Sequence, residues 1–385
     1  DQMSKNRREF TNSLYARRLS EGTSLSLLGQ TNLNDFIANE YLKQTPGYTV
    51  DKYPEARYVR LADDLLEAYP GLLTYSSEYR ISEMRMNFDE VPAKDYGFKN
   101  ASKSLAFWGI NPNQSIDDAL RAQGYSQEPV TRFDTRQELS MPLAAGPVNI
   151  TPFAVGRFTA YSDDFAEFSQ DADQPYRLWA SEGVRVGTEI QHVDNTVESR
   201  LFDLHRIRHI VQPSVTLWHA DTTIDGVDIP VYDDGVESLA EGTAVRMAVD
   251  QTWQTQRGGP GRWRSVDVFR FNAELVVSSG DVNQESPIGR YFDYRPEYSN
   301  LGDTYGTLDA AWQVTEVFGL GANMVYDFGI NQPARTDLGA TIQHSPFFST
   351  YLDLRYLNAE NSTIFIAGAE YELTRKYWVA GNVQY

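Results

Sequence analysis

The sequence predicts an all-β protein, a large antiparallel transmembrane β-barrel of the outer-membrane type with long polar loops on one side. Three observations lead to this prediction. Apolar residues recur at every second position, aromatic residues are frequent, and short turns alternate with long polar connections. A period of two places alternate side chains on opposite faces of a sheet. Tilted strands of about ten residues are long enough to cross a bilayer.

The clearest alternation lies near the C-terminus. The odd positions of residues 365–373 carry Phe, Ala, Ala, Tyr and Leu, and polar or small residues occupy most even positions. After the turn Arg375-Lys376, the odd positions of residues 377–385 carry Tyr, Val, Gly, Val and Tyr. This pattern predicts two strands joined by a tight turn, with aromatic residues at their ends.

Further alternating segments predict more strands of the same kind. They are residues 243–256, 306–314, 318–328 and 352–356. The glycine-rich stretch 258–261 is a strong turn signal. After it, the alternation slips in phase before Phe269 and Phe271. We expect roughly fifteen strands in one barrel domain that includes all of residues 1–385.

Connection lengths support the same plan. Residues 314–318 and 373–377 form tight turns, whereas residues 88–130, 162–177, 220–242 and 278–298 form long polar connections. Short turns at one end and long loops at the other are typical of outer-membrane barrels. A helix is predicted only at residues 115–123, where Ser115 caps the start and Asp117 and Asp118 lie in the first turn.

Composition excludes several classes of protein. No apolar run approaches the roughly 18 residues of a membrane helix, yet aromatic residues make up 13% of the chain, as in interfacial girdles. The net charge of −19 argues against a nucleic-acid partner. The absence of cysteine excludes disulfides and thiolate metal sites.

Candidate catalytic and metal residues are weak. On a strand, His205 and His209 lie over ~13 Å apart at ~3.3 Å per residue, too far for one zinc ion. The acidic loop 221–228, with Asp233 and Asp234, offers oxygen ligands for calcium or magnesium. A solvated surface loop is the simpler interpretation. Carboxylate pairs such as Asp63-Asp64 are unavoidable among 53 acidic residues, so we expect no enzyme and no bound cofactor.

Residues 204–215 form the most specific segment. A basic patch with Arg206, Arg208 and His209 leads directly into a strand. Pro213 predicts a bulge or irregular pairing, because proline donates no hydrogen bond to a neighbouring strand. The structural alternative is a strand with one polar face toward the lumen.

This segment resembles part of the LPS-assembly outer-membrane protein family (the organic-solvent-tolerance or LptD family), whose members carry an Arg-x-Arg-His-x-x-x-Pro stretch as residues 206–213 do. Other similar passages occur in the same order. They are residues 34–36, 47–48, 52–58, 132–134, 139–142 and 151–153. Tyr53 stands where a leucine is usual, and the cysteines that cross-link some members are absent.

The resemblance implies an outer-membrane translocon of a Gram-negative (diderm) bacterium that inserts lipopolysaccharide into the outer leaflet. The implied partners are membrane lipid, lipopolysaccharide, a lipoprotein plug in the lumen and a periplasmic lipid-transport bridge. Compared with the family pattern, we expect the periplasmic jelly roll and the first barrel strands, and the last strands too, to lie outside residues 1–385.

Two other classes stay open. A generic porin or solute-uptake barrel shares the alternation, and a secreted β-rich enzyme or sugar-binding protein would need a compact carboxylate cleft. For a lipid path, the candidate lumenal cations are Arg206, Arg208, Arg246 and Arg270, which would bind phosphates. A lumenal salt bridge is the alternative role for each of them.

Overall fold

The computed structural model describes most of the chain. The described residues are 11–33, 48–122, 126–162, 174–225, 229, 231–233, 235–237, 239, 241–259, 261–279, 304–358 and 361–385.

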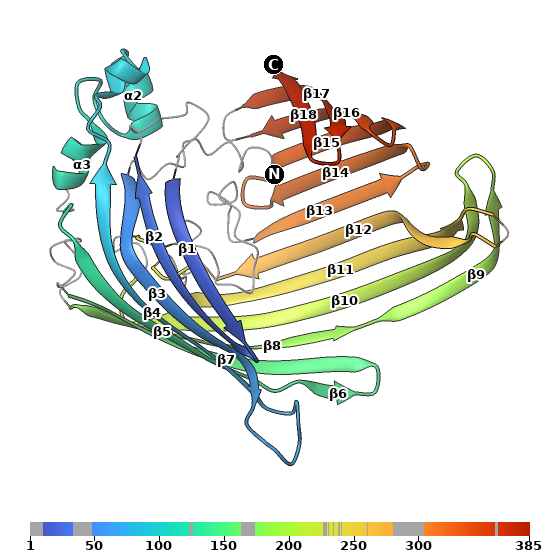
Figure 1. Cartoon of the computed structure of the whole chain (residues 1–385), viewed down its shortest axis with the longest axis horizontal. Helices are drawn as coiled ribbons and strands as arrows, with labels where there is room; N and C mark the ends of the chain where they lie inside the picture. Colours follow the sequence, from blue (N-terminus) through green and yellow to red (C-terminus); the bar gives the residue numbers. More distant parts are fainter. Residues whose placement is uncertain are drawn as a thin grey trace.

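Within these residues the chain forms one sheet of 18 strands (Figure 1). The strands are β1 (Thr11–Ser20), β2 (Thr23–Asn32), β3 (Tyr48–Asp64), β4 (Thr74–Phe88), β5 (Val130–Ser140), β6 (Leu143–Ala145), β7 (Val148–Tyr161), β8 (Tyr176–Thr188), β9 (Ile190–Ser199), β10 (Leu204–Thr222), β11 (Gly242–Arg257), β12 (Arg264–Ser278), β13 (Thr304–Gln313), β14 (Phe318–Asp327), β15 (Gln332–Ser345), β16 (Phe348–Leu357), β17 (Ser362–Thr374) and β18 (Tyr377–Gln384).

Every pairing in the described sheet is antiparallel and joins near neighbours in sequence. β1 to β5 pair in order, β5 and β6 both pair with β7, and β7 pairs with β8. β8 and β9 share β10 as a partner, and β10 to β18 again pair in order. The sheet curls so that β1–β7 face β10–β18 across a hollow (Figure 1). The predicted all-β antiparallel fold is confirmed.

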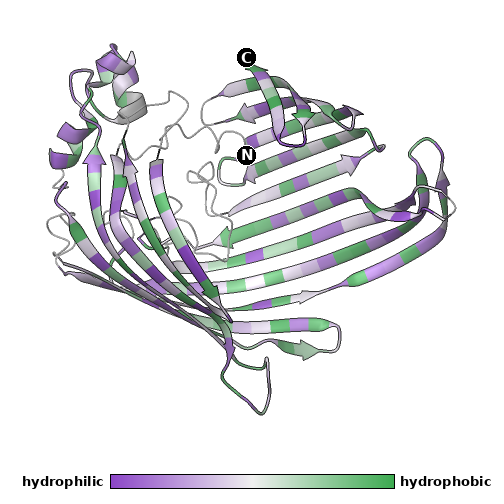
Figure 2. Cartoon of the chain, in the orientation of Figure 1, coloured by the Kyte–Doolittle hydropathy of each residue, from purple (hydrophilic) through white to green (hydrophobic). Residues whose placement is uncertain are grey.

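The register confirms the predicted two-residue alternation. Ala367, Ala369 and Tyr371 of β17 lie opposite Val383, Gly381 and Val379 of β18. The same face continues through the apolar positions of β13–β16, and these side chains are largely exposed, as a lipid-facing surface requires. Hydrophobic and hydrophilic residues alternate along many strands (Figure 2). We call this exposed apolar face the outer face.

Two irregularities predicted from the sequence are present. The register between β11 and β12 shifts at Trp253, where Val268 is the extra residue, and this explains the phase slip before Phe269. β10 pairs with β9 up to Val211 and with β8 from Ser214 onward, so the ladder on that side is interrupted at Gln212 and Pro213. The missing N–H of Pro213 fits this interruption.

Short and long connections lie at opposite ends, as predicted. The short-turn end carries the β1–β2, β13–β14, β15–β16 and β17–β18 hairpin turns. The connections after β4, β7, β10 and β12 lie at the other end, the long-loop end. The one after β4 holds a 3-10 helix η1 (Ala93–Tyr96) and two helices, α2 (Ala101–Trp108) and α3 (Ile116–Ala122).

The predicted helix is confirmed as α3. The Ser115 hydroxyl accepts from the Asp118 amide at 3.1 Å, and the Asp118 carboxylate accepts from the Ser115 amide at 3.0 Å. This reciprocal cap satisfies amides at the helix start. In the part of the chain described, none of the helices combines the length and hydrophobicity needed to cross a membrane.

A substitution at Gly183 of β8 tests the packing on the side of the sheet opposite the outer face. A Cβ atom there would lie 2.3 Å from the Leu217 carbonyl oxygen and 2.5 Å from Cζ of Phe153. We expect Gly183→Val to destabilise the sheet by about 1–3 kcal/mol through overpacking. Gly156→Val is the control, because a Cβ there meets nothing within 4 Å. Urea unfolding of detergent-solubilised protein measures both, and equal stability of the two variants would contradict the packing assigned to Gly183.

Candidate functional site

We call the connection between β10 and β11, residues 223–241, the inward loop; its described residues fold back onto the sheet. Among its described apolar residues, Ile229, Val236 and Leu239 are at most 5% exposed. Because the side chains that it covers come from β3 through β14, the loop lies on the concave side of the curled sheet. This concave side is the inner face.

The inward loop packs against the sheet in two apolar clusters. Ile224, Ile229 and Tyr232 pack against side chains of β4, β5 and β7, namely Met84, Met86, Phe88, Val130 and Tyr161. Leu239 packs in a second cluster, which includes Trp179, Trp218 and Tyr305. Buried side chains of this size contribute about 1.5–3 kcal/mol each.

Cationic side chains of β3, β5, β7 and β8 hold the loop by binding its carboxylates and its backbone carbonyls. Arg132 of β5 donates to Asp233 and to Glu237, each at 2.6 Å. Lys52 of β3 also pairs with Asp233. The Lys52 and Arg132 side chains are 8% and 0% exposed, so these ion pairs lie largely out of water.

Two more arginines bind the loop backbone. Arg157 of β7 donates to the Gly235 carbonyl at 2.6 Å while its other nitrogens form a bidentate pair with Asp134. Arg177 of β8 donates to the carbonyls of Glu237 and Leu239, at 2.6 and 2.9 Å. We call Lys52, Arg132, Arg157 and Arg177 the cation clamp.

Glu237 is the centre of this arrangement. Its side chain is fully buried, and its carboxylate accepts from Arg132, from the Tyr161 hydroxyl and from the Asp233 amide. A buried charge costs several kcal/mol to desolvate unless such partners compensate it. The Tyr48 hydroxyl, which donates to the Val231 carbonyl at 2.7 Å, adds a further anchor.

The electrostatics of Asp233 favour the docked loop at neutral pH. Burial alone would raise the pKa of Asp233, but the charges of Arg132 and Lys52 outweigh it and lower the pKa to about 2. The carboxylate is therefore ionised over the physiological range.

The inner face of β11–β15, away from the clamp, carries acidic and amide side chains. The register places one polar residue per strand in a row across β11–β15. The row reads Asp250, Asn272, Asp309, Asn323 and Asp337. Asn272 donates to Asp250 and Asn323 donates to Asp309, while Arg335 and Arg355 pair with Asp337. Ala311, Gly321 and Gly339 beside the row leave the wall shallow, and a groove of about 530 Å³ lies there.

The structure places three of the predicted lumenal cations on the inner face, each with a partner. Arg246 pairs with Glu274 at 2.5 Å. Arg270 donates to Asp267 at 2.9 Å, and Arg208 donates to Gln191 at 2.9 Å and to Gln254 at 3.3 Å. Lumenal salt bridges and amide contacts thus occupy side chains that we expected to bind phosphates.

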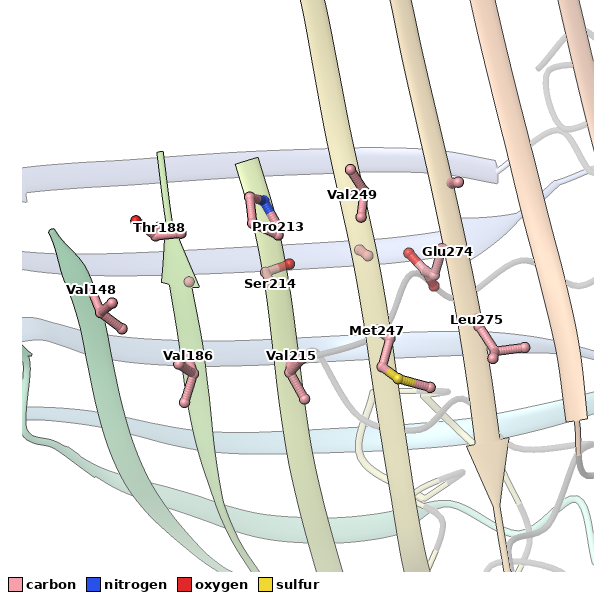
Figure 3. Close-up of a pocket in the computed structure, with 13 residues that line it drawn as sticks. Val148, Val186, Thr188, Pro213, Ser214, Val215, Met247, Val249, Glu274 and Leu275 are labelled. Carbon is pink, nitrogen blue, oxygen red and sulfur yellow. The ribbon is translucent and has the colours of Figure 1, made fainter. Parts of the chain in front are cut away.

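The other predicted site residues lie elsewhere. Arg206 is exposed at a register shift of β10, with a φ of 61°, so it does not continue the face of Arg208. His209 lies on the outer face, stacked on Trp253 at 4.2 Å between ring centroids. Pro213 is also on the outer face, in an apolar groove with Val186, Val215 and Met247 (Figure 3).

The inward loop corrects one prediction. The solvated-surface interpretation is wrong for Asp233, which pairs with Lys52 and Arg132 of the clamp, whereas Asp221 and Asp225 are exposed as expected. Asp228 and Asp234 of the predicted acidic loop lie outside the described residues. No group of three or more His, Cys, Asp or Glu able to hold a metal occurs in the described ranges.

The cation clamp was not predicted as a site, although Lys52 and Arg132 lie in segments that resemble the LPS-assembly family. A signal was present: Arg132, Asp134, Arg136 and Glu138 alternate along one face of β5. A charged inner face of that kind needs counter-charges, and the acidic connection after β10 supplies them.

Comparisons with known proteins give limited information. A scan against protein families and a search of curated proteins give no match. Among solved structures, a triple mutant of the Rhodopseudomonas blastica porin is similar at 12% identity and a TM-score of 0.25, covering 67% of this chain and 87% of that chain. A structure described as asymmetric conductivity of engineered proteins is similar at 13% identity, with the same coverage and TM-score. Because a TM-score of 0.25 is too low to carry an argument, the fold and the candidate site rest on the geometry of this chain alone.

Removing Arg132 tests the clamp. We expect Arg132→Leu to destabilise the docked loop by about 3–5 kcal/mol, because Glu237 and Asp233 would keep buried charge without their main partner. Limited proteolysis at neutral pH should cleave residues 223–241 in this variant. Arg270→Leu, which removes an exposed ion pair, should change stability by less than about 1 kcal/mol and leave the loop protected. Full protection in Arg132→Leu would contradict the clamp.

Acid should release the loop. Because the pKa of Asp233 is lowered from 3.8 to about 2, its contribution to docking is complete above pH 3.8 and is lost as the pH falls through about 2. An acid protease active from pH 4 to 2 should cleave the loop increasingly over that window. Asp233→Asn should be cleaved already at pH 4. A pH-independent cleavage of the unmodified protein would show that Asp233 does not stabilise the docked state.

Proposed function

We propose that this chain forms the wall of an outer-membrane channel through which small polar solutes diffuse, with the inward loop narrowing the lumen. The observation that carries the proposal is the attachment of residues 223–241 to the inner face by buried cations and apolar contacts. A loop fixed on the inner face of a curled, polar-walled sheet would narrow a path that runs along that face.

The outer face supports embedding in a membrane. Along β10, Val211, Pro213, Val215 and Leu217 lie between His209 and His219 on that face. The two histidines are separated by about 33 Å of strand at ~3.3 Å per residue, or about 25 Å along the barrel axis at a tilt of ~40°. This span matches the apolar band of outer-membrane barrels, about 25 Å tall.

Aromatic side chains mark the short-turn side of this band. Trp253 lies between His209 and Phe269, with ring centroids 4.2 and 5.1 Å away, and Phe202 contacts Trp312. Aromatic rings concentrate at membrane–water interfaces, because one part of the ring system is apolar and the other tolerates water. The short-turn end then faces the periplasm and the long-loop end faces outward, in the outer membrane of a Gram-negative bacterium.

The channel fits the described contacts better than lipopolysaccharide insertion. Insertion needs inner-face cations that are free to bind phosphate, and Arg246 and Arg270 are engaged by Glu274 and Asp267. Asp250 and Asp309 of the row accept from asparagines and have no ion-pair partner among the described residues, so they would repel phosphate groups. The lipoprotein plug and periplasmic bridge implied by the family resemblance stay predictions.

Conductance in planar bilayers tests the proposal. The unmodified protein should form open channels, and the double variant Asp233→Asn, Glu237→Gln should conduct several-fold more because the loop leaves the lumen. The control Glu67→Gln changes an exposed carboxylate in the short-turn connection after β3 and should conduct like the unmodified protein. An inserted barrel without measurable conductance, combined with retention of lipopolysaccharide through purification, would favour the lipid-inserting alternative.

A further inference from the structure

A second groove lies on the outer face at β4–β10. It has a volume of about 570 Å³ and a floor of small or apolar residues, Leu139, Ala154, Gly156 and Ala180. The groove crosses β4, β5, β7, β8 and β10, which are successive neighbours in the sheet. At ~4.8 Å between strands, it is about 19 Å long, comparable to the ~15 Å depth of one leaflet's hydrocarbon.

One end of this groove is polar. Glu182 of β8 lies directly opposite His219 of β10, and Asp221 follows two positions later on the same face. Directly opposite side chains have Cβ atoms about 5 Å apart, and diagonal neighbours about 7–8 Å. All three side chains are exposed and line the groove.

The carboxylate of Glu182 has no ion-pair or hydrogen-bond partner among the described residues, although apolar Ala180 and Val184 flank it on the outer face. The Nδ1 atom of His219 lies 2.9 Å from the Thr243 hydroxyl, which orients the ring and leaves Nε2 accessible. An unpaired carboxylate next to lipid is costly, so this position favours a cationic ligand.

The height of these groups fits a lipid headgroup. His219 marks the long-loop boundary of the apolar band on β10, which is the level at which headgroups meet hydrocarbon. From there the groove continues across the strands to Leu139 and to Leu65, in the short-turn connection after β3. A polar end and an apolar channel therefore lie in the order of a phospholipid's head and tail.

We propose that this groove binds a phospholipid whose headgroup carries a primary ammonium. The ammonium donates to Glu182 and Asp221, the Nε2 atom of His219 faces the phosphate, and one acyl chain lies over Ala154, Gly156 and Ala180. This site rests on the proposed membrane embedding, but it does not depend on solute conduction.

The groove around Pro213 is the natural control (Figure 3). It has a similar volume of about 570 Å³ and also lies on the outer face. Its only charged lining residue, Glu274, belongs to the inner face, where it pairs with Arg246. An acyl chain could pack in this groove, but no outer-face carboxylate lines it to bind an ammonium group.

Native mass spectrometry of the full chain in detergent, with equimolar phosphatidylethanolamine, phosphatidylcholine and phosphatidylglycerol, tests the proposal. We expect phosphatidylethanolamine to be retained preferentially, because a quaternary ammonium cannot donate hydrogen bonds. Glu182→Gln with Asp221→Asn should lower its retention roughly tenfold, the loss expected for charge-assisted hydrogen bonds. Ala273→Leu, in the control groove, should leave retention unchanged.

Equal retention of the three lipids, or an equal effect of the two sets of variants, would overturn the proposal and indicate non-specific lipid contact. Asp221→Asn alone provides a second, milder variant at the strand end, should the double variant fold poorly. Conductance of the same preparations separates the two claims: a conducting channel without lipid preference refutes only the groove, and a non-conducting barrel that retains phosphatidylethanolamine refutes only the channel.

Discussion

The buried ion pair between Arg132 and Glu237 fixes the inward loop, and the character of the lumen depends on it. Both side chains are fully buried, so each charge is stable only while the other is present. Tyr161, Asp233 and the clamp arginines complete the set of partners. If this pair is lost, the loop keeps its apolar contacts but not the charge compensation that holds it against the wall.

The rest of the inner face follows from that arrangement. The clamp uses its cations on the loop and on Asp134, so the wall of β3–β8 presents little free positive charge at this level. The wall of β11–β15 keeps its row of Asp and Asn residues beside a shallow surface. A solute path would run between the loop and this acidic wall, which favours neutral or cationic solutes over phosphate-bearing lipids.

Much of the sheet could be predicted from the sequence, because these features depend on residues that are close together in the chain. The two-residue period of residues 365–385, the phase slip before Phe269 and the break near Pro213 each reflect backbone geometry within one or two strands. The inward loop could not be predicted in the same way. Its key pairs join residues such as Arg132 and Glu237, and nothing in either segment alone shows which face the other will reach. The acidic loop therefore looked like a solvated surface segment. Arg206 was misplaced for a related reason: the register shift at this residue removes it from the face of Arg208.

The most direct test of the central claim is a single cysteine in the inward loop. The sequence contains no cysteine, and a Cβ at Gly235 meets nothing within 4 Å, so Gly235→Cys adds one unique thiol with little disturbance. The account predicts that a bulky, water-soluble thiol reagent reduces single-channel conductance in this variant, because the label lies in the solute path. Gly156→Cys, on the outer face, should be insensitive to the reagent. Complete labelling of Gly235→Cys without any change in conductance would contradict a loop that constricts the channel.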